Sequence, residues 1–64
     1  MAIAERDVRS KIIDASRDLF LEFGPSRVRM EEIAEKLAMS KKTLYKYFAS
    51  KDEVLSAVLD ASHD

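Results

Sequence analysis

The only glycine and the only proline of this chain are neighbours, Gly24 and Pro25. A fold made of short strands needs frequent turns, and glycine and proline supply many of them. A single Gly-Pro pair in 64 residues therefore argues against a strand-rich fold and favours helices, one of which ends at this pair. With 47% hydrophobic and 36% charged residues, the chain has the balance of a folded domain, and its length is that of one domain.

Residue types that carry several kinds of chemistry are absent or rare. The sequence has no cysteine and one histidine, His63, which excludes a disulfide framework, thiolate metal sites and the usual histidine-dependent triads. We expect no cofactor and no metal ion. Apolar runs are only a few residues long, too short for a membrane span or a signal-peptide core. These features indicate a small cytoplasmic domain that binds a partner.

Positive charge is concentrated in one short segment. Residues 36–51 carry five lysines and no acidic residue, whereas residues 1–35 have a net charge of −2 and residues 52–64 one of −4. The total of −1 alone argues against nucleic-acid binding, but a basic segment between acidic flanks presents a local positive face. The same run also fits a solvated lysine-rich helix, so the residues between the lysines must decide.

Apolar residues recur at helical spacing along most of the chain, which predicts four amphipathic helices. The first has an apolar face that extends from Val8 to Phe23 and leaves Leu21 on the opposite side. The second and third have the spacing of a helix-turn-helix, although Ala38 stands where such turns usually have glycine. Any two short helices of a bundle would show similar spacing. The predicted helices cover residues 8–23, 30–37, 41–48 and 51–61.

Polar residues are placed to cap three of these helices. Asp7 precedes the first helix and Ser40 precedes the third. Ser50 and Glu53 form a capping box (S-x-x-E) at the start of the fourth. We expect residues 1–6 to form a frayed arm.

The third predicted helix has a buried and an exposed side when its residues are set at steps of about 100°. Leu44 and Phe48 define the buried side, and Lys42 and Lys46 point nearly opposite. Tyrosines usually fill a core, but two of them beside Phe48 cannot all face one core, so at least one phenol is expected in solvent. The flanks carry Lys41 with Tyr45 and Thr43 with Tyr47.

An exposed helix of this composition suits duplex DNA. Lysine neutralises phosphate or donates to guanine O6 and N7, and hydroxyl groups donate to phosphate oxygens. An eight-residue helix is about 12 Å long and fits a major groove about 12 Å wide. Lys51 adds a cation to the first turn of the fourth helix, which makes sense if a phosphate binds there, although an ordinary solvated lysine also fits.

Four pieces of the chain together match a known pattern. They are I-I-D-A-S-R-D-L-F-L-E-F-G (Ile12 to Gly24), I-A-E-K-L-A-M-S (Ile33 to Ser40), T-L-Y-K-Y-F (Thr43 to Phe48) and S-K-D-E-V-L (Ser50 to Leu55). In this order and spacing, the chain resembles the N-terminal DNA-binding domain of the TetR (tetracycline repressor) family of bacterial transcriptional regulators. The match is in register without gaps.

The resemblance implies a single all-α domain over residues 1–64, homeodomain-like, with a three-helix core and a linking fourth helix. The helices over residues 30–37 and 41–48 would form the helix-turn-helix, with the latter as recognition helix in the major groove. Backbone contacts are implied for Thr43, Tyr45, Tyr47 and Lys51, and base contacts for Lys41, Lys42 and Lys46.

The sequence departs from the family pattern at a few positions. Val28 and Arg29 stand where the family usually has threonine or serine, so a charge contact from Arg29 would replace a hydroxyl contact to DNA. Ala38 replaces a frequent glycine of the turn. Lys42 replaces a frequent glycine of the recognition helix, so the sequence preference should differ from that of relatives with glycine there.

The resemblance also implies partners. Family members carry a C-terminal effector-binding and dimerisation domain. By this resemblance we expect that domain to be absent from the present chain, and the full-length protein to be a homodimer that binds a palindromic operator. The isolated domain is expected to be a monomer or a weak self-associator. The alternative function is a small protein-interaction module that docks through Leu21, Leu55 and Leu59.

An enzyme is a third possibility that the residues do not favour. The carboxylates of Glu31, Glu32 and Glu35 lie together in the second predicted helix. Carboxylates near a helix N-terminus are explained by the helix dipole, and no other reactive group converges on them. We therefore expect a DNA-binding domain and no catalytic activity.

Overall fold

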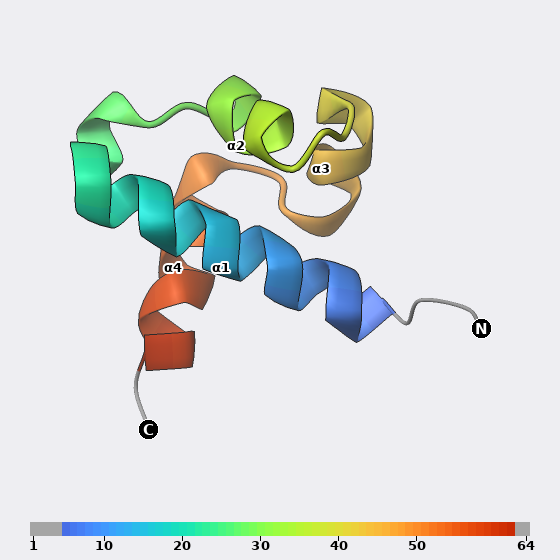
Figure 1. Ribbon diagram of the computed structural model, residues 1–64. Coiled ribbons are helices and arrows are strands. Elements are labelled where there is room, and N and C mark those ends of the chain that lie inside the picture. The colour runs from blue at the N-terminus through green and yellow to red at the C-terminus, as the bar shows by residue number, and fades with distance from the viewer. Residues whose placement is uncertain (1–4, 63–64) are drawn as a thin grey trace.

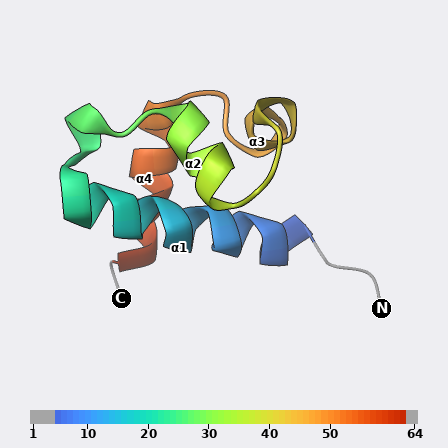
Figure 2. The same ribbon diagram turned by 45° about the horizontal axis from the view of Figure 1, so that its top comes forward.

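The computed structural model describes residues 5–62, and within them the side chains of residues 7–61. It confirms an all-α domain. The elements are α1 (Glu5–Phe23), a 3-10 turn η1 (Pro25–Arg27), α2 (Met30–Lys36), α3 (Lys41–Tyr47) and α4 (Lys51–Ser62). Figure 1 shows α2 and α3 on one side of α1, whereas α4 crosses α1 and ends on the other side. The view in Figure 2 gives the same arrangement. α1 packs against η1, α2 and α4, and α2 packs against α3.

The start of the first helix was predicted too late. α1 begins at Glu5, so Asp7 lies inside the helix and is not its N-cap. The expected frayed arm is wrong for residues 5 and 6, and residues 1–4 lie outside the described part of the chain. No glycine or proline precedes Val8, so nothing in the local sequence prevents residues 5–7 from joining the helix. The other predicted helices end within one residue of the observed ones.

The Gly-Pro pair ends α1 as predicted. Gly24 has φ 91° and its N–H donates to the carbonyl oxygen of Phe20 at 2.9 Å. Its ψ of 144° places it in an extended conformation open to glycine, and not in the left-handed helical one common at the ends of helices. Pro25 then opens η1, which periodicity did not predict. Phe23, expected on the apolar face, is 52% exposed because the chain turns away at this last residue of α1.

The turn between α2 and α3 is a Schellman motif formed around an alanine. The Met39 N–H donates to the Ala34 carbonyl oxygen (2.9 Å), and the Ala38 N–H donates to that of Glu35 (3.1 Å). Ala38 has φ 56°, the left-handed region that favours glycine. The helix-turn-helix therefore forms without the usual glycine, and Ala38 stores backbone strain.

The predicted cap of the third helix is confirmed, and the predicted capping box of the fourth is confirmed in part. The Ser40 hydroxyl accepts the Thr43 N–H at 3.1 Å, as an N-cap does. At α4, the Ser50 hydroxyl accepts the Glu53 N–H at 3.4 Å. The Glu53 carboxylate accepts the N–H of Ala49 at 3.1 Å, one residue before its expected partner.

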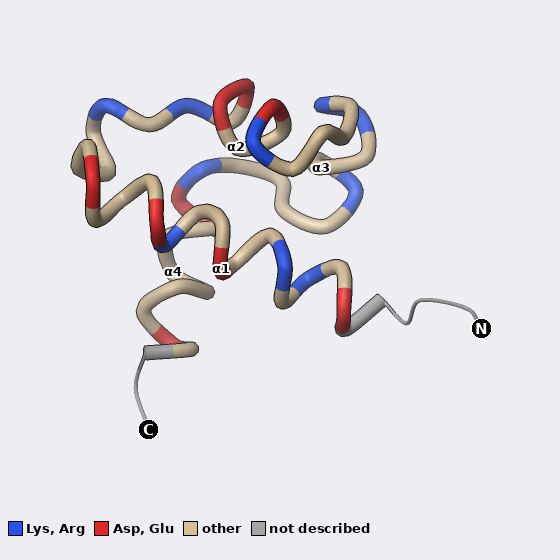
Figure 3. The backbone as a smooth tube through the Cα atoms, viewed as in Figure 1, with Lys and Arg blue, Asp and Glu red and all other residues tan. Residues whose placement is uncertain are grey.

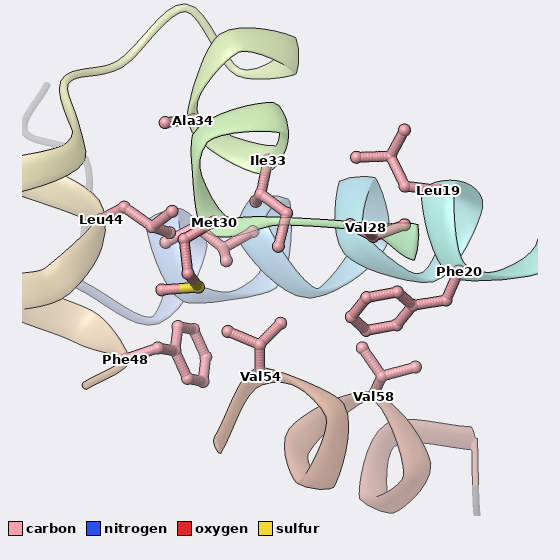
Figure 4. Packing of buried hydrophobic residues seen from close by; sticks show 11 residues of the cluster. Leu19, Phe20, Val28, Met30, Ile33, Ala34, Leu44, Phe48, Val54 and Val58 are labelled. Atoms are coloured by element: carbon pink, nitrogen blue, oxygen red, sulfur yellow. The ribbon is translucent and has the colours of Figure 1, made fainter. Parts of the chain in front are cut away.

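One hydrophobic core joins the four helices. Ile12, Ile33, Leu44 and Val54, each from a different helix, are fully buried. Figure 4 shows how most members of this core converge between the helices. α3 and α4 are thus held by the same side chains that hold α1 and α2. The core consists of Ile12, Leu19, Phe20, Val28, Met30, Ile33, Ala34, Leu44, Phe48, Val54 and Val58.

Phe48 fixes the end of α3 on the body of the domain. It is the residue after α3, has an extended backbone, and is 1% exposed. The guanidinium of Arg9 lies over its ring, 4.9 Å from the centroid, and so joins the N-terminal half of α1 to the end of α3. Ser16 is the one buried polar residue found in the described part of the chain, and its hydroxyl has no hydrogen-bond partner there.

Candidate nucleic-acid interface

α3 presents one side to the core and the other to solvent. Leu44, in its middle, is fully buried, and Phe48 follows one turn later. Lys42 and Lys46 are exposed, as the 100° spacing predicts. We call the exposed side, formed by Lys41, Lys42, Tyr45 and Lys46, the α3 outer face.

The two tyrosines of α3 have different surroundings. Tyr45 is 47% exposed and belongs to the α3 outer face. Tyr47 is half-buried and packs against the core. The prediction that at least one tyrosine is largely exposed is therefore confirmed, and Tyr45 is that residue.

Thr43 is held by the cap of its own helix. Its side chain is half-buried, and its hydroxyl oxygen lies 2.9 Å from that of Ser40, with either group as donor. The Ser40 hydroxyl also accepts the backbone N–H of Thr43. These two hydrogen bonds hold the hydroxyls of Ser40 and Thr43 together at the N-terminus of α3. The helix dipole favours an anion at this end.

Lys41 is paired across the helix-turn-helix. Its Nζ lies 3.7 Å from Oε2 of Glu31, in the first turn of α2, and both side chains are more than half exposed. A hydrogen bond from its own backbone, followed by the positive charges of Lys41 and Arg29, lowers the pKa of the Glu31 carboxyl from its usual range. Residue spacing does not predict this pair, because it depends on how α2 and α3 pack.

Arg29 is the N-cap residue of α2. Its N–H donates to Oε1 of Glu32 at 3.0 Å, and its carbonyl oxygen accepts the N–H groups of Glu32 and Ile33. Its exposed side chain stands beside the first turn of α2. The backbone of Arg29 thus does the capping, while its charge adds to the positive potential near Glu31.

Lys51 makes a contact that spacing did not predict. It is half-buried, and its Nζ donates to the carbonyl oxygen of Pro25 at 2.7 Å. This bond joins the first turn of α4 to η1, across 26 residues of sequence. An ammonium group has three donors, so two remain for other acceptors. Lys51 is therefore not an ordinary solvated lysine.

Basic residues follow the side of the domain formed by the helix-turn-helix. Figure 3 shows Lys and Arg on the segment that leads into α2, along α3 and at the start of α4, with the acidic residues of α2 among them. α2 and α3 lie on the side of α1 away from the C-terminal end of α4 in both ribbon views. The predicted site residues thus come from one part of the fold.

Other chemistry has little support in the described residues. No group of three or more His, Cys, Asp or Glu side chains able to hold a metal ion lies within residues 5–62. Helices long and apolar enough to cross a membrane are likewise absent from that part of the chain. His63 lies outside it.

The comparisons with known proteins agree with this class of fold. The family model described as bacterial regulatory proteins, tetR family, matches residues 12–58. An HTH-type transcriptional repressor of Mycobacterium tuberculosis is 32% identical over 60 residues, which cover 94% of this chain and 32% of the repressor. The HTH-type transcriptional regulator SrpR of Pseudomonas putida is 36% identical over 58 residues, 91% of this chain and 27% of SrpR. No solved structure matches the chain.

The four helices and the α2–α3 turn define a helix-turn-helix domain of a transcriptional regulator. The chain belongs to the TetR family, because the family model matches well over half of its residues. It spans about a third of the length of the curated relatives it matches.

Proposed function

We propose that this domain binds duplex DNA in a sequence-specific manner, with α3 in the major groove. The α3 outer face carries this proposal: its amines and the Tyr45 phenol point away from a core that holds Leu44 and Phe48 in place. Three lysines and no acidic residue lie within α3. Such a surface complements a polyanion, and its helix matches the width of the groove.

The residues of the interface have different tasks in this proposal. Lys41, Lys42 and Lys46 reach base edges, where an ammonium group donates to guanine O6 and N7. Thr43 and the two tyrosines contact the DNA backbone with their hydroxyls, and Lys51 and Arg29 contact phosphates. The bond from Lys51 to Pro25 supports the Lys51 assignment, since it holds the amine beside the segment that leads to Arg29.

The wider function follows from the family and is part of the proposal. The protein acts in the cytoplasm as a regulator, most simply a repressor, that is not an enzyme and needs no cofactor. Two heads in a homodimer would read a palindromic operator, and the second head would raise the affinity of the pair through its effective concentration. A single domain would then bind DNA more weakly than the dimer.

A salt titration tests DNA binding. With two phosphates neutralised, by Lys51 and Arg29, log K should fall against log salt with a slope of about −1.8, an affinity loss of about 12-fold between 50 and 200 mM salt. Lys42→Ala and Tyr45→Phe should each weaken binding. Lys11→Ala removes an exposed lysine of α1 and is the matched control. A flat titration, or unchanged binding by both α3 variants, contradicts the proposal.

A surface groove favours protein interaction as the second candidate function. A cavity of about 320 Å³ lies between α1 and α4, lined by Leu21, Leu55, Leu59 and their neighbours. Leu21 is 79% and Leu59 63% exposed, as expected for a docking surface, whereas Leu55 is half-buried against the core. Sedimentation at increasing concentration distinguishes the two functions: strong self-association that Leu59→Glu abolishes, without DNA affinity, favours this one.

A further inference from the structure

The ion pair between Lys41 and Glu31 places a carboxylate beside the α3 outer face. It is the one ion pair that joins two helices in the described residues, since the other, Arg17 with Asp14, lies within α1. Glu31 stands in the first turn of α2 and Lys41 in the first turn of α3. The helix dipole favours a carboxylate at this end of α2. On a surface that binds a polyanion, however, a carboxylate also weakens that binding.

We propose that Glu31 is a specificity-determining residue, which cancels the attraction of Lys41 for phosphates while leaving the Lys41 amine free to donate to a base. This inference rests on the proposed function. It assigns Glu31 a positioning role, because Glu31 acts on DNA through Lys41. The pair would improve the preference of the domain for one duplex over another, and not its affinity for all duplexes.

The distance between the two groups indicates that Lys41 can lose its net charge to Glu31 and still keep its hydrogen-bond donors. At 3.7 Å, the Nζ–Oε2 separation is an ion pair but is longer than a charge-assisted hydrogen bond, about 2.7–2.9 Å. An ammonium group has three donors, so at least two N–H groups of Lys41 stay available to other acceptors. A base-edge contact needs such directed donors, because guanine offers O6 and N7 as fixed acceptors.

The charges act differently from the donors. A lysine that is already neutralised by a carboxylate adds no net charge, so it displaces no counterion from the phosphate backbone. Non-specific binding depends on that displacement almost entirely, whereas specific binding also has the base contacts. A glutamate is ionised at neutral pH, and the backbone hydrogen bond and the charge of Lys41 lower the pKa of Glu31 further, so the pair stays neutral as a unit.

The test compares two duplexes and five proteins. One duplex carries the site selected by the unaltered domain from random sequences, and the other has the same composition in scrambled order. Affinities for both are measured between 50 and 200 mM salt for the unaltered domain, Glu31→Gln, Lys41→Gln and the double variant. Glu22→Gln makes the same charge change at an exposed residue near the far end of α1 and is the matched control.

We expect Glu31→Gln to steepen the salt slope on the scrambled duplex by about 0.9, so that its affinity falls about 3.5-fold more across this range than that of the unaltered domain. At 50 mM salt it should bind the scrambled duplex more tightly, and its preference for the selected site should fall. The double variant should return to the original slope. Glu22→Gln should leave the slope and the preference unchanged.

Two results would overturn the inference while leaving the proposed function in place. The first is a Glu31→Gln variant with the slope and preference of the unaltered domain. The second is a Glu31→Gln variant that loses affinity for the selected site alone, which would mean that Glu31 itself contacts a base, as a carboxylate does when it accepts from the cytosine amino group. An unaltered domain that binds neither duplex contradicts the proposed function and this inference together.

Discussion

Replacing Ala38 with glycine should stabilise the domain, although glycine usually weakens a helical protein. Ala38 has φ 56° at the end of α2. A residue with a Cβ loses roughly 1–2 kcal/mol in the left-handed region, and glycine avoids that loss. Glycine gives back about 0.5–1 kcal/mol through its greater freedom in the unfolded chain. The difference predicts a stabilisation of about 0.5–1 kcal/mol for Ala38→Gly.

Urea denaturation followed by circular dichroism measures this difference. For a domain of this size, 1 kcal/mol corresponds to a change in melting temperature of about 4–8 °C. Ala57→Gly, in the interior of α4, makes the same change in a right-handed helix and should cost about 1 kcal/mol or more. If Ala38→Gly destabilised the domain as much as Ala57→Gly, the left-handed conformation of Ala38 would be wrong.

Three further substitutions test the packing and the chain reversals. Ser16→Ala removes a buried hydroxyl that has no partner in the described residues and should raise the free energy of unfolding by about 1 kcal/mol; a clear loss would mean that the hydroxyl is bonded. Leu44→Ala should cost about 2–5 kcal/mol in thermal melts, against less than about 0.5 kcal/mol for the exposed Leu21→Ala. Gly24→Ala should cost about 1–2 kcal/mol from its φ of 91° alone, because nothing lies within 4 Å of the added Cβ, and a neutral melt would contradict that strain.

The sequence predicted those features of the fold that depend on local pattern. Periodicity found α2, α3 and α4 because each has a capping residue or an acidic first turn at its start and an apolar face that packs on the core. It placed the start of α1 at residue 8, where the apolar pattern begins. The helix itself begins at Glu5, because a helix can extend past its apolar pattern where no glycine or proline interrupts it. The turn at Ala38 shows that tertiary packing can hold a residue in a conformation that its own preference disfavours.

For the candidate site, only the features that depend on local sequence could be predicted. The sides of α3 follow from its own sequence, so the burial of Leu44 and the exposure of Lys42 could be foreseen. The contact between Lys51 and Pro25 and the pair between Lys41 and Glu31 join segments that only packing brings together. No spacing rule applies to such contacts. DNA contacts by any of these residues remain predictions.

The most direct measurement follows the backbone amide signals of the labelled domain while a duplex is added. The duplex should carry the site that the domain itself selects from random sequences. If α3 lies in the major groove, the changed signals should be confined to residues 29–51, with the largest along α3. Changes concentrated around Leu21 and Leu59, with α3 unaffected, would contradict the account.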